Sequence, residues 1–154
     1  MPESSSDREV ARNRRAYHDY FVEERFEAGM VLTGTEVKSI RGGKCNLRDG
    51  YVRIDGSQAW LEQVHISPYA QGGVFNHEPL RPRKLLLHRR EIASLIGKVR
   101  QRGYTLIPLR VYFTRNRAKL EFGLCRGKRE YDKRQSIAEA DARREMARAL
   151  RQRG

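Results

Sequence analysis

The sequence predicts a mainly β fold, a small antiparallel OB-like β-barrel with two to three flanking helices and a flexible basic C-terminal tail. Five or six short segments have strand patterns, two have helix patterns, and the two kinds do not alternate as they do in βαβ folds. A small barrel pairs its own edge strands, so we favour it over an open sheet. The 154 residues are enough for one core of ordinary size and favour a single domain.

The first strand is expected near the N-terminus, after a segment without structure. Residues 1–12 are polar and serine-rich, and we expect them to be disordered. Residues 17–26, "YHDYFVEERF", combine aromatic and β-branched side chains, which is typical of a strand. Ala28 and Gly29 bound this strand at its C-terminal end.

A short helix and a hairpin are expected next. Thr35 is placed to act as the N-cap of a helix that the glycine pair of "KSIRGG" ends. Residues 51–55 and 59–66 have strand patterns, and the Asp55-Gly56 dipeptide between them is a tight-turn signal. These two strands are therefore expected to form a hairpin.

The middle of the chain predicts a loop and then a clearer helix. Residues 67–83, "SPYAQGGVFNHEPLRPR", hold three prolines and two glycines without a period, so we expect a mobile loop. The following segment, "LLLHRREIASLIGKVRQRG", has one apolar stripe at helical spacing on an otherwise basic surface, and Gly103 closes it. The stripe consists of Ile92, Leu95, Ile96 and Val99.

Two half-buried strands follow this helix. In "TLIPLRVYF" one face is predicted to be apolar and the other to carry Arg110 and Tyr112, and "AKLEFGLC" alternates in the same way around Lys119 and Glu121. The apolar residues are Ile107, Leu109, Val111 and Phe113 in the first strand, and Ala118, Leu120, Phe122 and Leu124 in the second. The turn "TRNR" joins them as a hairpin. Pro108 has no amide donor, so we expect it at a sheet edge or a bulge.

The C-terminal segment permits a helix but gives it little to bury. From residue 126 onward the only large apolar side chains are Ile137, Met146 and Leu150, which form no continuous stripe. We therefore divide the chain into a barrel over residues 13–130 and a tail over 131–154 that is disordered in the free protein and folds on a partner. The tail arginines that can contact phosphates are Arg143, Arg144, Arg148, Arg151 and Arg153.

The net charge of +13 is concentrated in one third of the chain. Residues 81–129 hold 15 Lys and Arg against Glu91 and Glu121, whereas the remaining residues hold 17 charges of each sign. A cationic surface this local, interleaved with aromatic residues, suits a polyphosphate partner whose counterions are released on binding. A merely basic surface is the alternative. An acidic membrane surface is disfavoured because no strongly amphipathic anchor accompanies the charge.

No motif for catalysis or metal binding is visible in the sequence. Cys45 and Cys125 are 80 positions apart without a CxxC, which favours two reduced structural thiols over a disulfide framework or a zinc site. The four histidines lack ligand spacing such as HExxH, and a nucleophile elbow, a Walker loop and a GxGxxG are absent. No stretch approaches the roughly 20 apolar residues of a membrane span, so we expect a soluble, cytoplasmic protein without a cofactor.

Three glutamates near the N-terminus have more than one possible role. Glu23, Glu24 and Glu27 lie close in sequence and suggest general acid-base chemistry, yet no neighbour is placed to raise one pKa and lower another. Salt bridges to the basic surface are the favoured interpretation. A glutamate beside an RNA path has a third role, because a carboxylate can accept hydrogen bonds from the amino edges of bases.

Several stretches of the sequence follow a known family pattern. They are "NRRAYHDYFVEERFEAGMVLTGTEVKSIRGGKCNLRDGYV", "HISPYAQG", "RPRKLLLHRREI", "GYTLIPLRVYF" and "LCRGKREYDKRQ". Together they resemble the bacterial SsrA-binding protein family, also called small protein B. The resemblance covers residues 13–135 in order, and the combination of EAG, GTEVKS, RKLLL and GK[RK]xxDKR is very specific.

The resemblance implies an RNA-binding function. It implies an OB-like barrel that binds the tRNA-like part of transfer-messenger RNA, supports the aminoacylation of this RNA and escorts it to ribosomes stalled on messages without a stop codon. This process is trans-translation, and the family is not catalytic. The positions that match its RNA-binding residues are Asn13, Glu27 and Leu86, and the neighbours added by charge are Lys38, Arg41, Arg83 and Lys84.

The resemblance also implies contact with the small ribosomal subunit and its 16S RNA. The positions that match the elements near the decoding centre are Gly127, Lys128, Arg129, Tyr131, Asp132, Lys133 and Arg134, and the tail beyond is expected to become helical in the empty message channel. Elongation factor Tu and alanyl-tRNA synthetase are expected as indirect partners through the RNA. The protein itself is expected to be a monomer with no membrane partner.

Two other function classes are alternatives to this RNA-binding module. An RNA-modifying or hydrolytic enzyme of the same fold needs a metal cluster or an acid-base pair, and the sequence shows neither. A structural ribosomal protein has similar charge, but it is expected to co-purify stoichiometrically with ribosomes, whereas a rescue factor is not.

Overall fold

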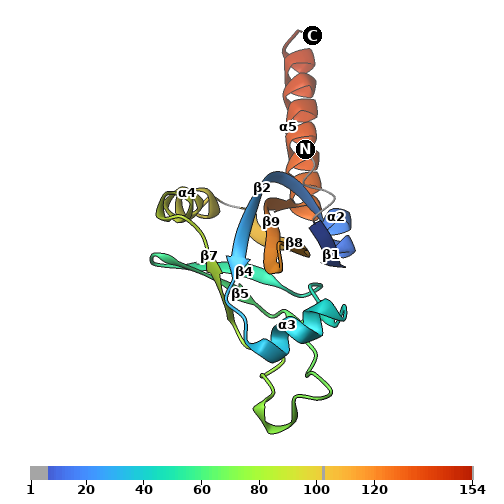
Figure 1. Ribbon diagram of the computed structural model, residues 1–154. Helices are drawn as coiled ribbons and strands as arrows, with labels where there is room; N and C mark the ends of the chain where they lie inside the picture. The colour runs from blue at the N-terminus through green and yellow to red at the C-terminus, as the bar shows by residue number, and fades with distance from the viewer. Residues whose placement is uncertain (1–6, 102, 154) are drawn as a thin grey trace.

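The computed structural model describes residues 7–101 and 103–153, which form an antiparallel seven-stranded sheet with helices around it (Figure 1). The sheet order is β1-β8-β9-β2-β7-β5-β4, and β3 and β6 form a separate two-stranded sheet. The strands are β1 (Asp7–Arg12), β2 (Tyr20–Met30), β3 (Cys45–Asn46), β4 (Tyr51–Asp55), β5 (Gln58–Glu62), β6 (His65–Ile66), β7 (Arg83–Leu86), β8 (Tyr104–Thr114) and β9 (Arg117–Gly127). The helices are α2 (Arg14–Asp19), α3 (Gly34–Arg41), α4 (Arg89–Val99) and α5 (Lys128–Arg153), with a 3-10 turn η1 (Gly73–Phe75). The predicted mainly antiparallel β fold is confirmed.

Strand β2 joins the two halves of the sheet. Its residues from Tyr20 to Gly29 pair with β9, and Gly29 and Met30 also pair with β7. Buried side chains from both halves, such as Phe122 and Leu61, belong to one core. Among the described residues no ladder joins the outer strands β1 and β4, so the sheet surrounds this core without closing into a hydrogen-bonded barrel.

The N-terminal segment contains a strand that its composition does not predict. The disorder expected for residues 1–12 is wrong for Asp7–Arg12, which form β1 and pair with β8. Val10 and Ala11 pack against the core, and this contact outweighs the polar composition of the segment. Residues 1–6 lie outside the described residues.

The strand predicted over residues 17–26 both begins and ends too early. The Asn13 side chain accepts a hydrogen bond from the Ala16 amide at 3.1 Å and so caps α2, which makes the start of this segment helical. β2 begins at Tyr20 and runs on to Met30, because its last residues find a partner strand in β7.

The next elements follow the prediction with shifted ends. Thr33 rather than Thr35 is the N-cap of α3: its hydroxyl accepts from the Glu36 amide at 3.3 Å, and the Glu36 carboxylate accepts from the Thr33 amide at 2.8 Å. The β4–β5 hairpin is confirmed. β5 ends at Glu62, earlier than predicted, because Gln63 has a left-handed φ of 58°.

Pro108 lies at a β-bulge, one of the two places predicted for it. The pairing of β8 with β9 shifts between Pro108 and Arg110, which leaves Leu109 as an extra residue. The predicted single apolar face is therefore divided. Val111 and its neighbours face the main core, whereas Ile107 and Leu109 pack in a second cluster against α2. The alternation predicted for β9 is confirmed, and the turn into it has left-handed residues at 115 and 116.

The loop predicted over residues 67–83 is confirmed except at its last residue, and its mobility stays a prediction. Arg83 opens β7, which pairs with both β2 and β5 and was missed because four mixed residues show no strand period. The helix after it is confirmed as α4, whose apolar stripe buries Ile92 and Leu95.

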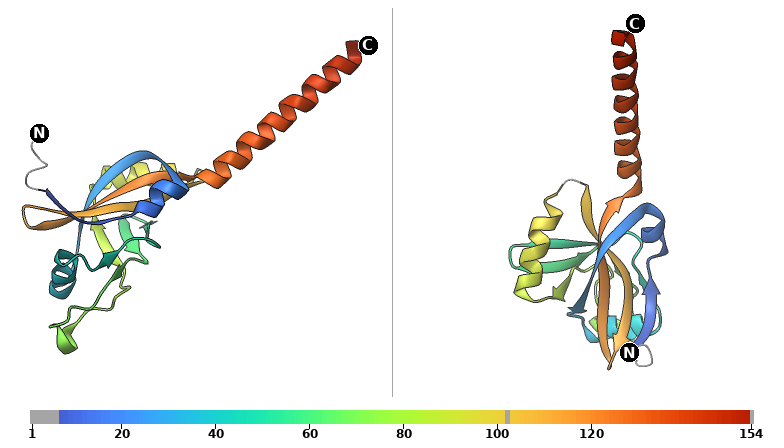
Figure 2. Two further views of the ribbon diagram at one scale, coloured as in Figure 1. Left: turned by 90° about the vertical axis from the view of Figure 1, so that its right-hand side faces the viewer. Right: turned by 90° about the horizontal axis from the view of Figure 1, so that it is seen from above.

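Helix α5 stands away from the sheet in every view (Figures 1 and 2). It is a continuous helix from Lys128 to Arg153. Its described side chains from Ile137 to Arg151 are exposed, except that Ala140 is half-buried. The predicted lack of packing on the sheet is therefore confirmed for these residues. The melting of this helix in the free protein stays a prediction.

Candidate nucleic-acid interface

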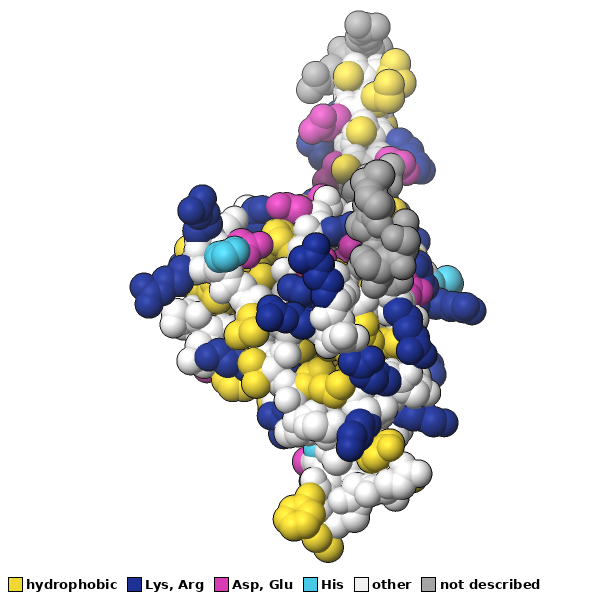
Figure 3. Space-filling view, viewed as in Figure 1, with side chains coloured by type: hydrophobic (Ala, Val, Ile, Leu, Met, Phe, Trp, Pro, Cys, Tyr) yellow, Lys and Arg dark blue, Asp and Glu magenta, His cyan; other side chains and the backbone are white. Residues whose placement is uncertain are grey.

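The side of the sheet that points away from the main core, the outer face, carries charged residues on its central strands. Lys119 and Glu121 alternate with the buried Leu120 and Phe122 on β9, so they belong to this face. The register places Arg110 of β8 and Glu27 of β2 on either side of Glu121. Figure 3 shows many Lys and Arg and few Asp and Glu side chains over this view of the molecule.

The carboxylates of this face are held by neighbouring donors. Glu121 accepts hydrogen bonds from Arg110 at 3.2 Å and from Arg25 at 3.4 Å. Glu27, its like-charged neighbour, accepts a hydrogen bond from the Tyr112 hydroxyl. Each carboxylate therefore has its own donor, which offsets the repulsion expected for like charges opposite each other.

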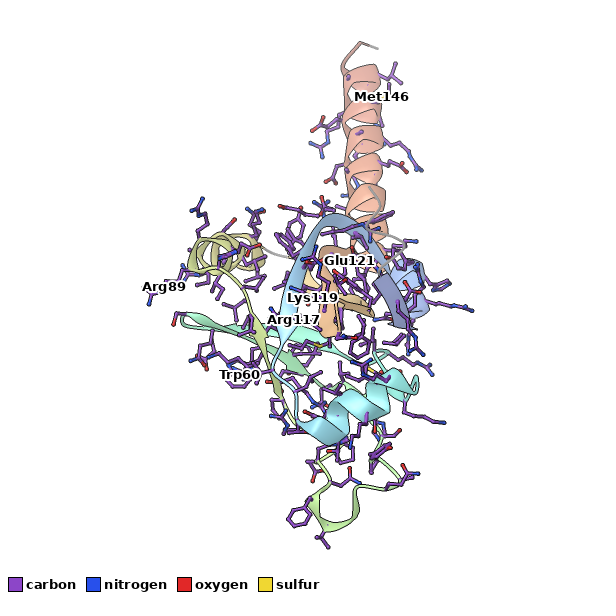
Figure 4. All side chains as sticks on the ribbon, viewed as in Figure 1. Trp60, Arg89, Arg117, Lys119, Glu121 and Met146 are labelled. Atoms are coloured by element: carbon purple, nitrogen blue, oxygen red, sulfur yellow. The ribbon has the colours of Figure 1, made fainter. Side chains whose placement is uncertain are left out.

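A cleft of about 770 Å³ opens where β2, β7 and the start of α4 meet. Its charged and polar wall consists of Arg25, Glu27, Ser57, Gln58, Lys84, His88, Arg89, Glu91 and Lys119, and its apolar wall includes Leu86. Gly29 lies between Leu86 and Lys119 in the strand register and has no side chain. The outer face is therefore hollow at this position, and cations surround the hollow. Arg89 and Lys119 are labelled in Figure 4.

Three of the residues predicted to bind RNA come together in this cleft. Glu27, Lys84 and Leu86 all line it, although they lie far apart in the sequence. Leu86 is 55% exposed, so it presents an apolar surface among these charges. This combination of an acceptor, a cation and an apolar surface can contact a base and its phosphate together.

Three cations of the cleft have no acidic partner. Within the described part of the chain, no carboxylate lies within 4.0 Å of the side-chain nitrogens of Lys84, Arg89 or Lys119. Sequence reasoning missed Arg25, Arg89 and Lys119. The alternation of β9 put Lys119 on the outer face, but only the register of β2 with both neighbours brings it beside Leu86. Cations without partners are the ones that release counterions when they bind phosphate.

Two of the predicted RNA-binding residues are buried and form hydrogen bonds that hold the fold together. The Arg83 side chain is fully buried, donates to Glu36 at 2.6 Å and donates to the carbonyl oxygens of Val64 at 2.6 Å and Pro79 at 3.0 Å. Charge alone suggested this residue as an RNA contact, and the structure contradicts that role.

Asn13 has a similar position. It is 3% exposed, and its amide nitrogen donates to the carbonyl oxygens of Pro108 at 2.9 Å and Leu47 at 3.3 Å, while its amide oxygen caps α2. All its polar atoms are used inside the fold. Any effect of this residue on RNA binding must therefore pass through the placement of β1, α2 and the bulge in β8.

Lys38 and Arg41 lie on α3 and do not line the cleft. The Lys38 ammonium is 5.4 Å from the centroid of the Tyr69 ring, and the Arg41 guanidinium is 4.5 Å from that of Phe113. α3 and α4 lie at different ends of the sheet in Figure 1. The two basic residues of α3 therefore belong to a different surface from the cleft.

The second predicted site begins where β9 becomes α5. Gly127 ends β9, and the Lys128 ammonium donates to the carbonyl oxygen of Tyr17 at 3.0 Å and lies 5.3 Å from the centroid of the Phe21 ring. Lys128 thus ties the start of α5 to the end of α2. The side chains of the remaining predicted residues lie outside the described part of the structure: Arg129, Tyr131, Asp132, Lys133 and Arg134.

Cys45 and Cys125 are free thiols that belong to different clusters of the core. Burial raises the pKa of Cys45 to about 12 and that of Cys125 to about 11, so both are protonated at neutral pH. Among the described residues no group of three or more His, Cys, Asp or Glu side chains is placed to hold a metal ion. Nor does any described helix have the length and apolar character that crossing a membrane requires.

Comparisons with known proteins agree with one another. A family model described as "SmpB protein" matches residues 10–152. A protein of Desulfitobacterium hafniense described as "SsrA-binding protein" is 61% identical over 145 residues, which are 94% of this chain and 93% of the relative. One of Roseiflexus castenholzii with the same description is 62% identical over 148 residues, 96% of this chain and 94% of the relative.

A solved structure is also similar. A chain in a structure described as "tmRNA-SmpB: a journey to the center of the bacterial ribosome" superposes with a TM-score of 0.66 and is 49% identical. The match covers 77% of this chain and 83% of that one.

Proposed function

Because the chain belongs to the SmpB protein family, we propose that it binds the tRNA-like part of transfer-messenger RNA and delivers this RNA to stalled ribosomes for trans-translation. The chain is an RNA-binding protein and not an enzyme. The single observation that carries the RNA contact is the cleft around Gly29, where Lys84, Arg89 and Lys119 have no acidic partner among the described residues.

The cleft gives each of its residues a distinct task. Lys84, Arg89 and Lys119 bind phosphates, which supplies affinity without sequence preference. Glu27, held by the Tyr112 hydroxyl, accepts hydrogen bonds from the amino edge of a base, and Leu86 contacts the base or sugar. This division explains why an exposed leucine and a carboxylate remain among so many cations.

The tail is the proposed ribosome-binding part. In this division residues 13–130 hold the RNA, and residues 131–154 enter the decoding centre and the empty message channel, where α5 is helical. The elements around Gly127 and Lys128 then contact the 16S RNA, together with Arg129, Tyr131, Asp132, Lys133 and Arg134. The exposed arginines of α5 support this division, because solvent-accessible cations along a helix can contact RNA phosphates.

The remaining partners follow from the RNA. Elongation factor Tu and alanyl-tRNA synthetase act on the aminoacyl end of transfer-messenger RNA and so meet this protein only indirectly. The protein acts as a monomer in the cytoplasm. Size-exclusion chromatography with light scattering tests whether the protein is a monomer.

The test of the function is a comparison of two RNAs. Gel shifts with transfer-messenger RNA and an ordinary tRNA are expected to show a clear preference for the former, which a merely basic surface does not give. The affinity should fall with salt, with a slope of about −0.7 to −0.9 per phosphate contact. Equal binding of both RNAs contradicts the proposal.

Variants then locate the surface. Lys84→Ala combined with Lys119→Ala should weaken binding and reduce the salt slope by about 1.4 to 1.8, since two phosphate contacts are lost. Arg148→Ala combined with Arg151→Ala is the matched control, because it also removes two charges but lies on α5. An equal loss in this control indicates that only net charge matters.

A further inference from the structure

We propose that Trp60 is a stacking platform for an unpaired base of the bound RNA, next to the cleft. This inference rests on the proposed function and adds a contact that lies outside the cleft. Trp60 lies in β5 between the buried Ala59 and Leu61, so its side chain belongs to the outer face. It is half-buried, and Figure 4 labels it on the sheet.

Two cations flank the indole ring in the strand register. Trp60 pairs with Arg53 of β4 on one side and with Lys84 of β7 on the other. Residues directly opposite on the same face have their Cβ atoms about 4.5 to 5.5 Å apart. An aromatic surface between two cations is the arrangement by which proteins hold single-stranded nucleic acid: the ring stacks on a base and the cations bind its phosphates.

The surroundings favour a nucleotide over an apolar protein surface. Lys84 has no acidic partner in the described chain, and a protein pocket that covers Trp60 must bury this charge. Arg53 has partners in Glu62 at 2.9 Å and Asp55 at 3.3 Å, but its side chain remains 42% exposed and can turn toward a phosphate. The indole N–H has no hydrogen-bond partner among the described residues and is not one of the buried atoms left without one, so solvent reaches it.

Trp60 is continuous with the cleft. Gln58, the preceding outward residue of β5, lines the cleft, and so does Lys84, the cross-strand neighbour of Trp60. One outward step along a strand is about 7 Å. A base that leaves the cleft along β5 therefore meets the indole ring within one nucleotide of the phosphate that Lys84 holds.

The chain offers a direct probe of this contact, because Trp60 is its only tryptophan. The full-length protein is titrated with the tRNA-like domain of transfer-messenger RNA while tryptophan emission is recorded, and the same mixtures are run as gel shifts. Stacking should quench the tryptophan emission, and the RNA concentration at half-maximal quenching should equal the one at the midpoint of the gel shift. Bound RNA should also protect the indole from acrylamide quenching.

Substitutions separate stacking from charge. Trp60→Ala should weaken binding about 5- to 150-fold, the range for loss of one base-aromatic stack, without changing the salt slope. Lys84→Ala should instead reduce that slope by about 0.7 to 0.9. Trp60→Phe keeps an aromatic face and should recover most of the affinity. The control is Tyr51→Ala, an exposed aromatic of the neighbouring strand that does not line the cleft, and it should bind as the parent does.

The outcomes distinguish this inference from the proposed function. Preferential binding in the gel shift with unchanged emission and unprotected indole overturns the stacking role and leaves the function intact. Loss of any preference for transfer-messenger RNA in the unmodified protein overturns both. If Trp60→Ala does not fold, as its melting temperature shows, the emission titration of the unmodified protein and the affinity of Trp60→Phe decide the matter.

Discussion

At Gly29 the outer face of the sheet lacks a side chain between Leu86 and Lys119. The nearest neighbour of a Cβ atom at Gly29 is Leu86, at the ordinary contact distance of 3.5 Å, and the backbone there needs no left-handed conformation. The fold therefore tolerates a side chain at this position. Gly29 forms the floor of the cleft, and its missing side chain leaves the space above the sheet open.

Substitution at this glycine separates shape from stability. Gly29→Ala should fold and bind RNA nearly as the parent protein does, whereas Gly29→Leu should fill the hollow and weaken binding at least about tenfold, or 1.4 kcal/mol. Melting temperatures check that both variants fold, and gel shifts measure the binding. Unchanged binding by a folded Gly29→Leu variant means that the RNA does not enter the cleft.

Glu27 offers a second test at the residue scale. Glu27→Ala should weaken RNA binding with little change in melting temperature, because the carboxylate is exposed and water can take its place beside the Tyr112 hydroxyl. Glu27→Gln keeps an acceptor for both the hydroxyl and a base, so it should bind better than Glu27→Ala. A large fall in the melting temperature of Glu27→Ala assigns the residue a structural role instead.

The buried pair of Glu36 and Arg83 stabilises the frame under the site. Both side chains are fully buried, and Arg81 also donates to Glu36 at 2.6 Å. Arg83→Met should lower the free energy of unfolding by about 3–5 kcal/mol, because it leaves a buried carboxylate short of a partner. Arg81→Met, which removes a partner that is 35% exposed, should cost less. Urea unfolding measures both, and an equal cost contradicts the central role of Arg83.

The same pair predicts how stability depends on pH. Burial acts to raise the pKa of Glu36, but hydrogen bonds from Arg81, the Thr33 amide and Arg83 outweigh it and hold the pKa below the ordinary value of 4.5. Since the folded-state pKa is the lower one, this stabilisation is complete above about pH 4.5 and is lost as the pH falls through the folded value. Glu36→Gln should be less stable at neutral pH and show a shallower acid transition in urea unfolding from pH 7 to 3. An acid transition as steep as that of the parent rules out Glu36 as its source.

At the scale of the elements, local pattern predicted some segments and tertiary contact decided others. The β4–β5 and β8–β9 hairpins follow from alternation and turn residues that lie within a few positions of each other. β1 and β7 do not, because each is stabilised by a partner strand far away in sequence.

The candidate site divides in the same way. Resemblance to the family led to Asn13, Glu27 and Leu86; the structure brings Glu27 and Leu86 into the cleft, whereas Asn13 is buried elsewhere in the fold. Charge alone was a poorer guide, because it cannot distinguish the buried Arg83 from the unpaired Lys84 next to it. Arg25, Arg89 and Lys119 required the register of the sheet and the position of α4, which no local pattern contains.

Across the whole molecule, the surfaces for the two proposed partners are separate. The cleft lies among β2, β7 and α4, while the start of α5 is tied to α2 by Lys128. Few contacts connect the described part of α5 to the sheet, so removal of the tail should leave the folded body unchanged.

This separation predicts the effect of truncation. Deleting the residues after Arg134 should leave the affinity for transfer-messenger RNA nearly intact and abolish peptide tagging on stalled ribosomes. Circular dichroism of the full and truncated proteins measures the helix content that residues 135–154 contribute without a ribosome. A truncated protein that binds the RNA much more weakly contradicts the division between barrel and tail.

Because α5 is continuous, the position of each of its side chains relative to the start of the helix is fixed by helix geometry. An α-helix rises about 1.5 Å and turns about 100° with each residue, so the 26 residues from Lys128 to Arg153 span about 39 Å. The hydrogen bond of Lys128 to α2 fixes where the helix starts. One residue inserted near its start moves every later arginine by about 1.5 Å and 100°, whereas seven residues, close to two full turns, nearly restore the phase. The number of residues between Lys128 and a distal arginine thus determines the direction in which that arginine points relative to the RNA cleft.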